Sequence, residues 1–232
     1  MFTEKKFCSL SHRRQHKKAG EYLRTLYEKQ FPIDRQYRKM EAWLNLPPIE
    51  TPEAMADRFH LHMKEASIAL QEHNLLIKRF DTLSDTPYRP IHIYLDDLRS
   101  AFNIGNILRT TEAFRLGTII FSENTPDHTH PKVQKTAMGA SPPCKQGTLT
   151  LCPRPFIALE TVEGATPLRS FSFPESFTLL LGNEERGVKQ STLQEADFIV
   201  EIPLVGSKNS LNVASAFAIV AATIDTNNPI SL

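Results

Sequence analysis

The feature of the sequence that most constrains its fold is a change of pattern near residue 90. After the linker DTLSDTPYRP, short strand-like runs alternate with helical ones. The runs are IHIYLDD, NIGNILRTTEAFR, TIIFSE, a stretch around KVQKTAMG, FIALE, FTLLLG, FIVEIPL and a final helix. Strands that alternate with helices favour a mostly parallel sheet with helices on both faces. We therefore predict an α/β fold for residues 89–232.

The residues before this change predict helices alone. The pattern over residues 11–45 is helical and polar, and LPPIETPEA then interrupts it. Thr51 suits an N-cap and Pro52 suits the first position of a new helix. Apolar residues recur beyond it at roughly helical spacing, which predicts one long amphipathic helix over 52–80. We expect residues 1–88 to form a helical extension in front of the sheet.

Charge is distributed unevenly between these two parts. Residues 1–40 contain eleven Lys and Arg but four Asp and Glu, a net charge of +7, so the remaining residues carry −6 of the total of +1. Aromatic residues lie among the basic ones, and this combination suits phosphate contacts and base stacking. A solvated helix face is the alternative, and composition does not decide between the two.

The cysteines and the apolar runs exclude other classes of protein. Cys8, Cys144 and Cys152 show neither CxxC nor zinc-knuckle spacing, so we expect neither a disulfide framework nor structural zinc. No run of eighteen apolar residues occurs, and the start, MFTEKKFCSLSHRR, lacks the apolar stretch of a secretory signal. We therefore expect a cytoplasmic protein without membrane contacts.

Chemistry in parallel sheets gathers where strands end and helices begin. The first such junction, NIGNILRTTEAF, holds Asn103, Gly105 and Arg109 in an N-x-G-x-x-x-R pattern. On a helix Gly105 and Arg109 would share a face, where glycine permits close backbone approach and arginine offers a planar donor fork for phosphate.

The second junction, LLLGNEERGV, places Asn183 and Glu184 between Gly182 and Gly187. Glycines that bracket a turn permit positive φ and let a ligand press against the main chain. A purely structural turn is the alternative. Neither G-x-G-x-x-G nor GxxxxGK[ST] occurs, so the usual dinucleotide and nucleoside-triphosphate fingerprints are missing.

The third junction, EIPLVGSKNSLNVASAFAIVAATI, runs from a strand through a loop into an apolar helix. Ser207, Asn209, Ser210 and Asn212 lie where this helix begins. They can cap free backbone N–H groups and also present side chains to a ligand. Capping accounts for one or two of these residues but not for all four.

Together the three segments resemble the signature motifs of the SpoU (also called TrmH) family of RNA ribose 2′-O-methyltransferases, within the SPOUT superfamily. N-x-G-x-x-x-R, LGNE-x-x-G and IP-x-x-G-x-x-x-SLNV-x-x-A match in order and register, and KTAMGA at 135–140 is similar to a segment between the first two motifs. The resemblance covers residues from about 91 to 232. It implies a trefoil-knotted catalytic domain that binds S-adenosylmethionine in the knot without a metal, and a homodimer with its RNA site at the subunit interface.

The resemblance also implies roles for individual residues. Arg109 would activate the ribose hydroxyl, and stabilising the developing alkoxide is physically easier for it than acting as a base, because a free guanidinium has a pKa above about 12. Asn103, Glu184 and Asn212 would position Arg109 and the ribose. The cofactor pocket would be lined by Leu181, Gly182, Ile202, Leu204, Gly206, Ser210 and Leu211; for Ile202 and Leu204, packing is an equal alternative.

RNA contacts are expected from both parts of the chain. In the basic helical extension we expect them from Arg13, Arg14, Lys17, Lys18 and Arg24. In the catalytic domain we expect them from Lys132 and Lys135. The nearby stretch DHTH, with Asp127, His128 and His130, has no third histidine at helical spacing, so we expect no metal there.

The substrate stays open at this point. Many relatives carry a mixed α/β extension, whereas residues 1–88 predict helices only, so transfer RNA and ribosomal RNA are both compatible. Two other classes of function are an RNA-binding protein that keeps the knot without transferase activity, and a nicotinamide-dependent oxidoreductase. The missing glycine fingerprint argues against the second.

Overall fold

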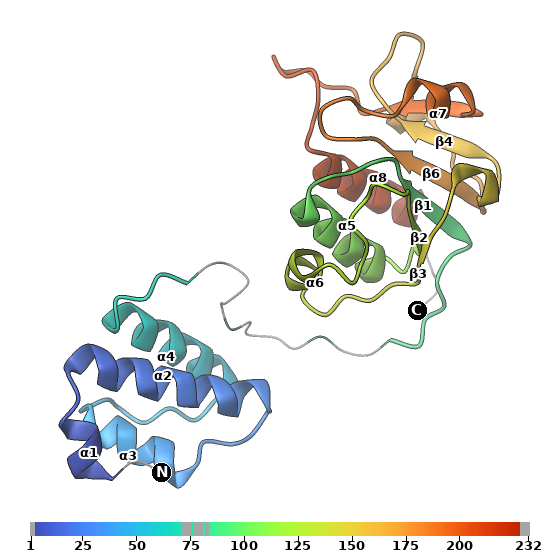
Figure 1. The fold of residues 1–232 in the computed structure, drawn as a ribbon. Coiled ribbons are helices and arrows are strands. Elements are labelled where there is room, and N and C mark those ends of the chain that lie inside the picture. Colours follow the sequence, from blue (N-terminus) through green and yellow to red (C-terminus); the bar gives the residue numbers. More distant parts are fainter. Residues whose placement is uncertain (1–2, 71–75, 77–80, 82–83, 228–232) are drawn as a thin grey trace. The chain divides into compact units, whose positions relative to one another are not determined.

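The computed structural model describes residues 3–70, 76, 81 and 84–227 (Figure 1). The chain divides into two compact units, Met1–Ser84 and Asp85–Leu232. This division falls close to the predicted boundary at residues 88 and 89. No described helix is both long enough and apolar enough to cross a membrane.

The first unit is helical, as predicted. Its helices are α1 (Glu4–Cys8), α2 (His12–Glu28), α3 (Arg35–Trp43) and α4 (Pro52–Glu65). They enclose one apolar core that includes Phe7, Leu23, Tyr37, Met40 and Phe59. Thr51 caps α4 by accepting a hydrogen bond from the Ala54 N–H at 3.2 Å, with Pro52 at the first position, which confirms the predicted start of this helix.

The predicted end of this helix is wrong, because α4 stops at Glu65 and does not continue through residue 70. Ser67 has a left-handed φ of 55°, and the Ile68 N–H donates to the Met63 carbonyl at 2.9 Å. This Schellman-type bond closes the helix although the apolar spacing continues beyond it. Residues 71–75 and 77–80 of the predicted helix lie outside the described residues.

The second unit is built on a seven-stranded sheet with the order β3-β2-β1-β6-β4-β7-β5. Every strand pairing is parallel. Five of the strands were predicted: β1 (Ile91–Leu95), β2 (Gly117–Phe121), β4 (Phe156–Leu159), β6 (Phe177–Leu181) and β7 (Phe198–Glu201). The two short edge strands β3 (Cys144–Gln146) and β5 (Thr166–Pro167) were not. Their two or three residues carry too little alternation to stand out from a loop.

Helices cover both faces of this sheet. One face packs against α5 (Ala101–Ala113), α6 (Pro131–Ala137) and α8 (Val213–Asn227), through residues such as Ile93, Ile107 and Phe217 (Figure 1). The other face carries a smaller cluster around Leu180, to which α7 (Gln190–Gln194) contributes Leu193. The predicted α/β class and the helices on both faces are confirmed. The threading of the chain into a knot stays a prediction.

A buried polar chain crosses the core of the first unit. His62, with 0% of its surface exposed, lies with its Nδ1 atom 3.0 Å from Nδ1 of His16 on α2 and its Nε2 atom 2.8 Å from the Tyr37 hydroxyl on α3. When one of the two facing Nδ1 atoms carries a proton, it donates and the other accepts. If both Nδ1 atoms were protonated, two donors would face each other. Burial, with smaller contributions from His16 and Arg58, lowers the pKa of His62 to about 3; burial and the neighbouring His12 lower the pKa of His16.

We expect the first unit to lose stability as the pH falls from about 6.5 towards 3. The unfolded chain takes up protons on these two rings near their ordinary pKa of about 6.5, while the folded rings resist protonation, so the unfolded state binds more protons in this window. The free energy of unfolding should fall by up to about 1.4 kcal/mol per pH unit for each ring. Urea unfolding followed by fluorescence of Trp43, the single tryptophan, measures it.

The variant His62→Asn supplies the control for this prediction. Asparagine keeps a polar group but does not titrate in this range, so the dependence on pH should become shallower even if the variant is less stable overall. An unchanged slope would show that His62 is not its source.

Candidate functional site

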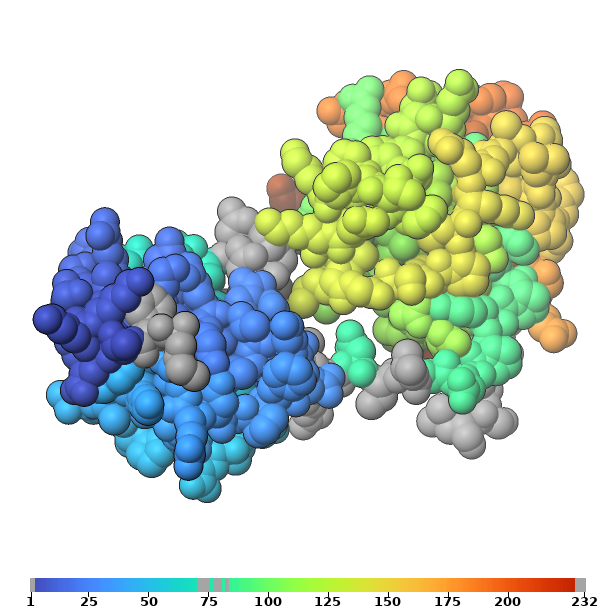
Figure 2. Space-filling view, turned by 60° about the horizontal axis from the view of Figure 1, so that its bottom comes forward, coloured from blue at the N-terminus to red at the C-terminus, as the bar shows by residue number. Residues whose placement is uncertain are grey.

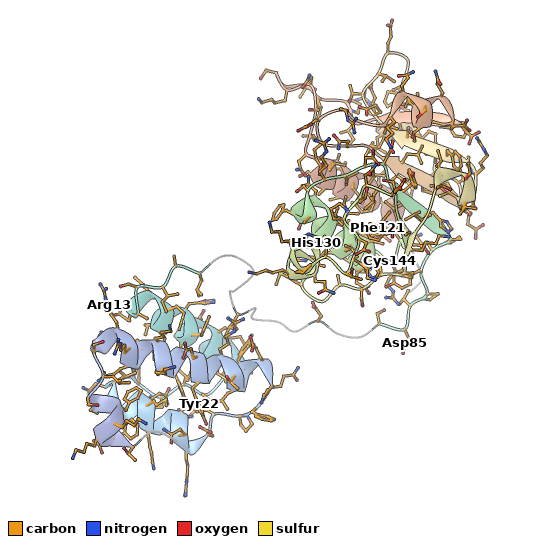
Figure 3. The ribbon with its side chains drawn as sticks, in the orientation of Figure 1. Arg13, Tyr22, Asp85, Phe121, His130 and Cys144 are labelled. Atoms are coloured by element: carbon orange, nitrogen blue, oxygen red, sulfur yellow. The ribbon has the colours of Figure 1, made fainter. Side chains whose placement is uncertain are left out.

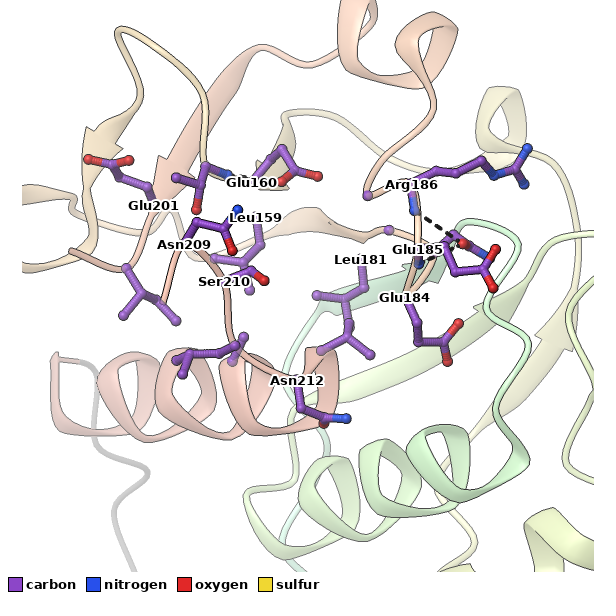
Figure 4. Close-up of a pocket in the computed structure, with 18 of the residues that line it drawn as sticks. Leu159, Glu160, Leu181, Glu184, Glu185, Arg186, Glu201, Asn209, Ser210 and Asn212 are labelled. Atoms are coloured by element: carbon purple, nitrogen blue, oxygen red, sulfur yellow. Dashed lines mark hydrogen bonds between the residues drawn. The ribbon is translucent and has the colours of Figure 1, made fainter. Parts of the chain in front are cut away.

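A cavity of about 470 Å³ lies at the carboxyl ends of β4, β6 and β7 (Figure 4). Its walls come from residues 159–161, 181–187, 201, 202, 204, 209–213 and 216. Six of the seven residues predicted to line a cofactor pocket are there: Leu181, Gly182, Ile202, Leu204, Ser210 and Leu211. Gly206 is not in this lining, and a Cβ atom built on it would meet nothing within 4 Å. The glycine at this position is therefore not required by packing within the chain.

The segment between β7 and α8 leaves its backbone groups unused. Residues 203–212 are all exposed, and none of the described residues from 203 to 211 makes a hydrogen bond within the chain. Ser207, Asn209 and Ser210 therefore do not cap α8, in agreement with the expectation that capping accounts for only one or two of the four residues. Backbone N–H and C=O groups beside the cavity are left available to a bound molecule.

Asn212 performs the capping instead. Its Oδ1 atom accepts hydrogen bonds from the N–H groups of Ala214 (3.0 Å) and Ser215 (3.3 Å), at the start of α8. Its Nδ2 atom donates to Oδ1 of Asn103 at 2.9 Å. One side chain thus begins the last helix and ties it to α5.

Asn103 connects this cap to the second motif. The residue lies on α5 with 5% of its surface exposed, and its Nδ2 atom donates to Oε1 of Glu184 at 3.0 Å. Glu184 also accepts the backbone N–H groups of Ser100 and Arg99, both at 3.0 Å, where α5 begins. A carboxylate there complements the partial positive charge of a helix N-terminus. The chain Glu184–Asn103–Asn212 therefore joins all three sequence motifs.

These contacts fix the protonation state of the carboxyl. Burial alone would raise the pKa of Glu184. The hydrogen bonds from the Arg99 N–H, the Asn103 amide and the Ser100 N–H outweigh burial and hold the pKa below its ordinary value. The group is ionised near neutral pH and accepts all of these donors.

The two glycines of the second motif have different tasks. Gly187 has φ of 70°, which confirms the positive φ expected of a turn, and it exchanges two backbone hydrogen bonds with Asn183 (2.9 and 2.8 Å). Gly182 is required by packing, because a Cβ atom there would lie 2.1 Å from the carbonyl carbon of Gly187. The turn folds back on the end of β6 and forms one wall of the cavity.

Arg109 lies apart from this chain of hydrogen bonds. Its side chain is exposed and lines a second cavity of about 540 Å³ along α5 and α8, together with Phe102 and Asn106. Among the described residues, Arg109 has no hydrogen-bond or ion-pair partner. Asn212 lines both cavities and is the point where they meet.

Gly105 and Arg109 lie four residues apart on α5, as predicted, but Gly105 is buried whereas Arg109 is exposed. A Cβ atom on this buried glycine would lie 2.5 Å from Cβ of Thr136 and 2.9 Å from the carbonyl oxygen of Val133, both on α6. The close backbone approach that Gly105 permits is therefore used to pack α5 against α6.

Sequence reasoning missed a charged cluster beside the turn. Asp97 has a φ of 57°, and its carboxylate accepts hydrogen bonds from the Lys189 ammonium (2.7 Å) and the Ser122 hydroxyl (2.9 Å). These bonds, that from Lys189 foremost, lower the pKa of Asp97. Asp96 accepts the backbone N–H of Lys189 at 3.0 Å. Two aspartates at the end of a buried strand were the signal that could have found this cluster.

The predicted RNA-contacting residues fall in both units. Arg13, Arg14, Lys17 and Lys18 are exposed on α2 of the first unit, and Arg24 is half-buried on the same helix. Lys132 and Lys135 are exposed on α6, in the yellow-green part of the second unit whose surface Figure 2 shows.

The side chains of the DHTH stretch have structural partners. Asp127 accepts hydrogen bonds from the N–H (2.8 Å) and hydroxyl (2.6 Å) of Thr129, and His128 stacks on Phe121. His130, labelled in Figure 3, caps α6 through the Lys132 N–H at 3.3 Å. Local structure accounts for the polar character of this loop.

Comparisons with known proteins agree on one family. The model of the SpoU rRNA Methylase family matches residues 90–222. The 23S rRNA (guanosine-2′-O-)-methyltransferase RlmB of Neisseria meningitidis is 27% identical over 143 residues, which cover 58% of this chain and 57% of that protein. The chain thus matches little more than half the length of this relative.

Solved structures share the fold. An AdoMet-bound rRNA methyltransferase from Sinorhizobium meliloti superposes with a TM-score of 0.56 at 24% identity, over 61% of this chain and 58% of that one. A putative RNA methyltransferase of the TrmH family from Porphyromonas gingivalis gives a TM-score of 0.53 at 19% identity, over 97% and 98% of the two chains.

Glu184→Gln should lower the free energy of unfolding of the second unit by about 2 kcal/mol, because hydrogen bonds to a charged acceptor would be lost and an amide NH₂ would face an N–H donor. Glu185→Gln is the matched control: this neighbouring carboxylate is 72% exposed and contacts only Arg99, so its loss should change stability by less than about 0.5 kcal/mol. Urea unfolding followed by far-UV circular dichroism compares the variants. Equal losses would contradict the central role of Glu184.

Proposed function

Because the chain belongs to the SpoU rRNA methylase family, whose model matches residues 90–222, we propose that it transfers a methyl group from S-adenosylmethionine to a ribose 2′-hydroxyl of RNA. The observation that carries this proposal is the hydrogen-bonded chain Glu184–Asn103–Asn212, which holds the three motifs at one edge of a cavity. The named relatives include both ribosomal RNA and tRNA/rRNA methyltransferases, so the substrate is a ribosomal or transfer RNA.

The cavity suits the proposed cofactor. Leu181, Ile202 and Leu211 give it apolar walls for a purine, and Ser210 adds a hydroxyl. The backbone beside it, over residues 203–211, has unused donors and acceptors that could read the edge of an adenine. S-adenosylmethionine would supply an electrophilic methyl group on a sulfonium. No metal is required for this chemistry, and in our proposal none takes part.

The chemistry asked of this chain is deprotonation of the ribose hydroxyl as it attacks that methyl group. Arg109 has no competing partner among the described residues, so its donor fork is available to an alkoxide and to the adjoining phosphate. Asn212 holds its position through α8 and Asn103 while bordering both cavities. It would orient the ribose between them, with Glu184 fixing Asn103 behind it.

We propose that the active form is a homodimer. The cavity that Arg109 lines also contains Phe102, 60% exposed, with the small apolar residues Ala113 and Ala218. An exposed aromatic residue in an apolar hollow is typical of an interaction surface. Within one chain Arg109 does not line the cofactor cavity. A second copy seated on α5 and α8 would bring Arg109 of the partner subunit to it.

The basic face of α2 is proposed to capture RNA in the cytoplasm. Arg13, Arg14, Lys17, Lys18 and Arg24 lie within an arc of about 140° on this helix, away from its buried side. Lys18 and Arg24 already form ion pairs with Glu21 (2.7 Å) and Glu28 (2.6 Å). Arg13 and Arg14 have no ion-pair partner among the described residues, and Lys17 lies 3.9 Å from Glu21, so these three are the stronger candidates for phosphate contacts. Lys132 and Lys135 on α6 are proposed as further contacts.

The proposed activity is tested with labelled S-adenosylmethionine and RNA from cells that lack the gene, with mass spectrometry locating the methylated ribose. Arg109→Ala should lower the rate about a hundredfold, the loss typical of a donor that stabilises a developing oxyanion. The affinity for S-adenosylmethionine should change no more than a few-fold, since Arg109 does not line that cavity.

Arg99→Ala is the matched control, because it removes an exposed arginine near the start of α5 that contacts only the exposed Glu185 through its side chain. It should keep most of the activity. Normal turnover by Arg109→Ala would remove this residue from the mechanism. Cofactor and RNA binding without methylation of any RNA would instead favour a non-catalytic binding protein.

Charge variants test the basic face better than a truncation would. Removing residues 1–40 would take Leu23 and Tyr37 from the core that buries Phe59. Replacing Arg13, Arg14 and Lys17 by glutamine should reduce the slope of log affinity against log salt by about 2, since each phosphate contact contributes about 0.7 on single strands and 0.9 on duplex. RNA binding across a salt series measures this slope.

The matched control removes three exposed charges elsewhere in the same unit, at Lys29, Arg35 and Lys39. It should reduce the slope clearly less than the α2 variant. If both variants reduce the slope equally, RNA responds to the net charge of the unit and not to the face of α2.

A further inference from the structure

We infer that Glu160 binds the ribose hydroxyls of the cofactor and thereby makes the cavity specific for ribonucleosides. This inference rests on the proposed function, because it assigns a residue to the same cavity. Glu160 belongs to none of the three sequence motifs. It follows β4 directly, at the carboxyl end of the strand, and lines the cavity between Leu159 and Thr161.

The carboxylate of Glu160 is held in place from both sides. Its Oε1 atom accepts the N–H of Thr161 at 3.0 Å, and its Oε2 atom accepts the N–H of Val188 at 2.9 Å. A Cβ atom at residue 187 would lie 2.2 Å from Oε2, so a glycine there makes room for the carboxylate. The group therefore has a fixed orientation before any ligand arrives, which lowers the entropic cost of binding.

Each carboxylate oxygen keeps an unused acceptor position. An ionised carboxylate has about four lone-pair sites, and the two backbone donors occupy two of them. Glu160 follows Leu159, which pairs with Leu181 on the neighbouring strand β6, and all three line the cavity (Figure 4). Fixed acceptors beside an apolar wall are the arrangement that a nucleoside with its hydroxyls at one end would meet.

The other carboxylates that line the cavity are less suited to this task. Glu184 accepts three hydrogen bonds within the chain. Glu185 is 72% exposed and pairs with Arg99. Glu201 points away from Asn209 and Ser210 (Figure 4). Glu160 alone of the four is both fixed by the backbone and left with acceptor capacity on each oxygen.

A ribose matches these acceptors by its chemistry. Its 2′- and 3′-hydroxyls are adjacent donors, and an acidic side chain near a strand end is a known partner for such hydroxyls in nucleotide-binding sheets. Hydrogen bonds to a charged acceptor are stronger than those between neutral groups. Loss of one of them should weaken binding about tenfold.

The test compares S-adenosylhomocysteine with its 2′-deoxy and 3′-deoxy ribose analogues, bound to the full chain and measured by calorimetry. The wild-type protein should bind at least one deoxy analogue about tenfold more weakly. In Glu160→Gln this difference should shrink to about twofold or less, because the amide keeps one oxygen for the turn but loses the charged pair of acceptors. Glu185→Gln is the matched control and should keep the wild-type difference.

The remaining outcomes overturn the inference in distinguishable ways. An undiminished difference in Glu160→Gln would show that the ribose lies elsewhere. An equal loss of affinity for all three ligands would show that Glu160 only supports the turn. Weaker binding of S-adenosylmethionine with unchanged binding of S-adenosylhomocysteine would place the carboxylate near the sulfonium. Failure of the wild-type protein to bind S-adenosylmethionine at all would overturn the proposed function itself.

Discussion

The second unit depends on one buried amide, the side chain of Asn103. Its nitrogen donates to Glu184, which also accepts backbone N–H groups at the start of α5, and its oxygen accepts from Asn212, which caps α8. A buried polar group without a partner costs about 1–3 kcal/mol, so the buried Asn103 amide favours the orientation in which both of its partners are in place. Asn212, to which Asn103 is hydrogen-bonded, borders both cavities.

Local rules predicted much of the fold. Capping chemistry located the start of α4 at Thr51 and Pro52, and buried apolar runs located the five central strands. The wrong predictions came where the apolar spacing and the local backbone conformation disagreed, or where a strand was too short to show a pattern. Apolar spacing continued past Glu65, but a left-handed Ser67 ended the helix, and no propensity marks a serine for that conformation. The edge strands β3 and β5 exist because neighbouring strands offer them hydrogen bonds, which their own two or three residues do not reveal.

The site was predictable as a set of residues and less so as an arrangement. Motif spacing brought Asn103, Glu184 and Asn212 together correctly, whereas Arg109 lies on another surface of the same helix. Glu160 and the cluster around Asp97 stand outside the motifs, because their partners are backbone N–H groups and a lysine about thirty to ninety residues away. Contacts between residues so far apart in the sequence depend on the order of the strands in the sheet. They can be recognised only when that order is known.

The segment over residues 203–211 is the part of the cavity wall that a bound ligand would stabilise most. Its amides are exposed and make no hydrogen bond within the described chain, so their hydrogens should exchange rapidly with solvent. A molecule that engages this backbone would slow that exchange along one continuous stretch of sequence. Slower deuterium uptake by peptides from this segment would then report that the cavity is occupied, without a measurement of turnover.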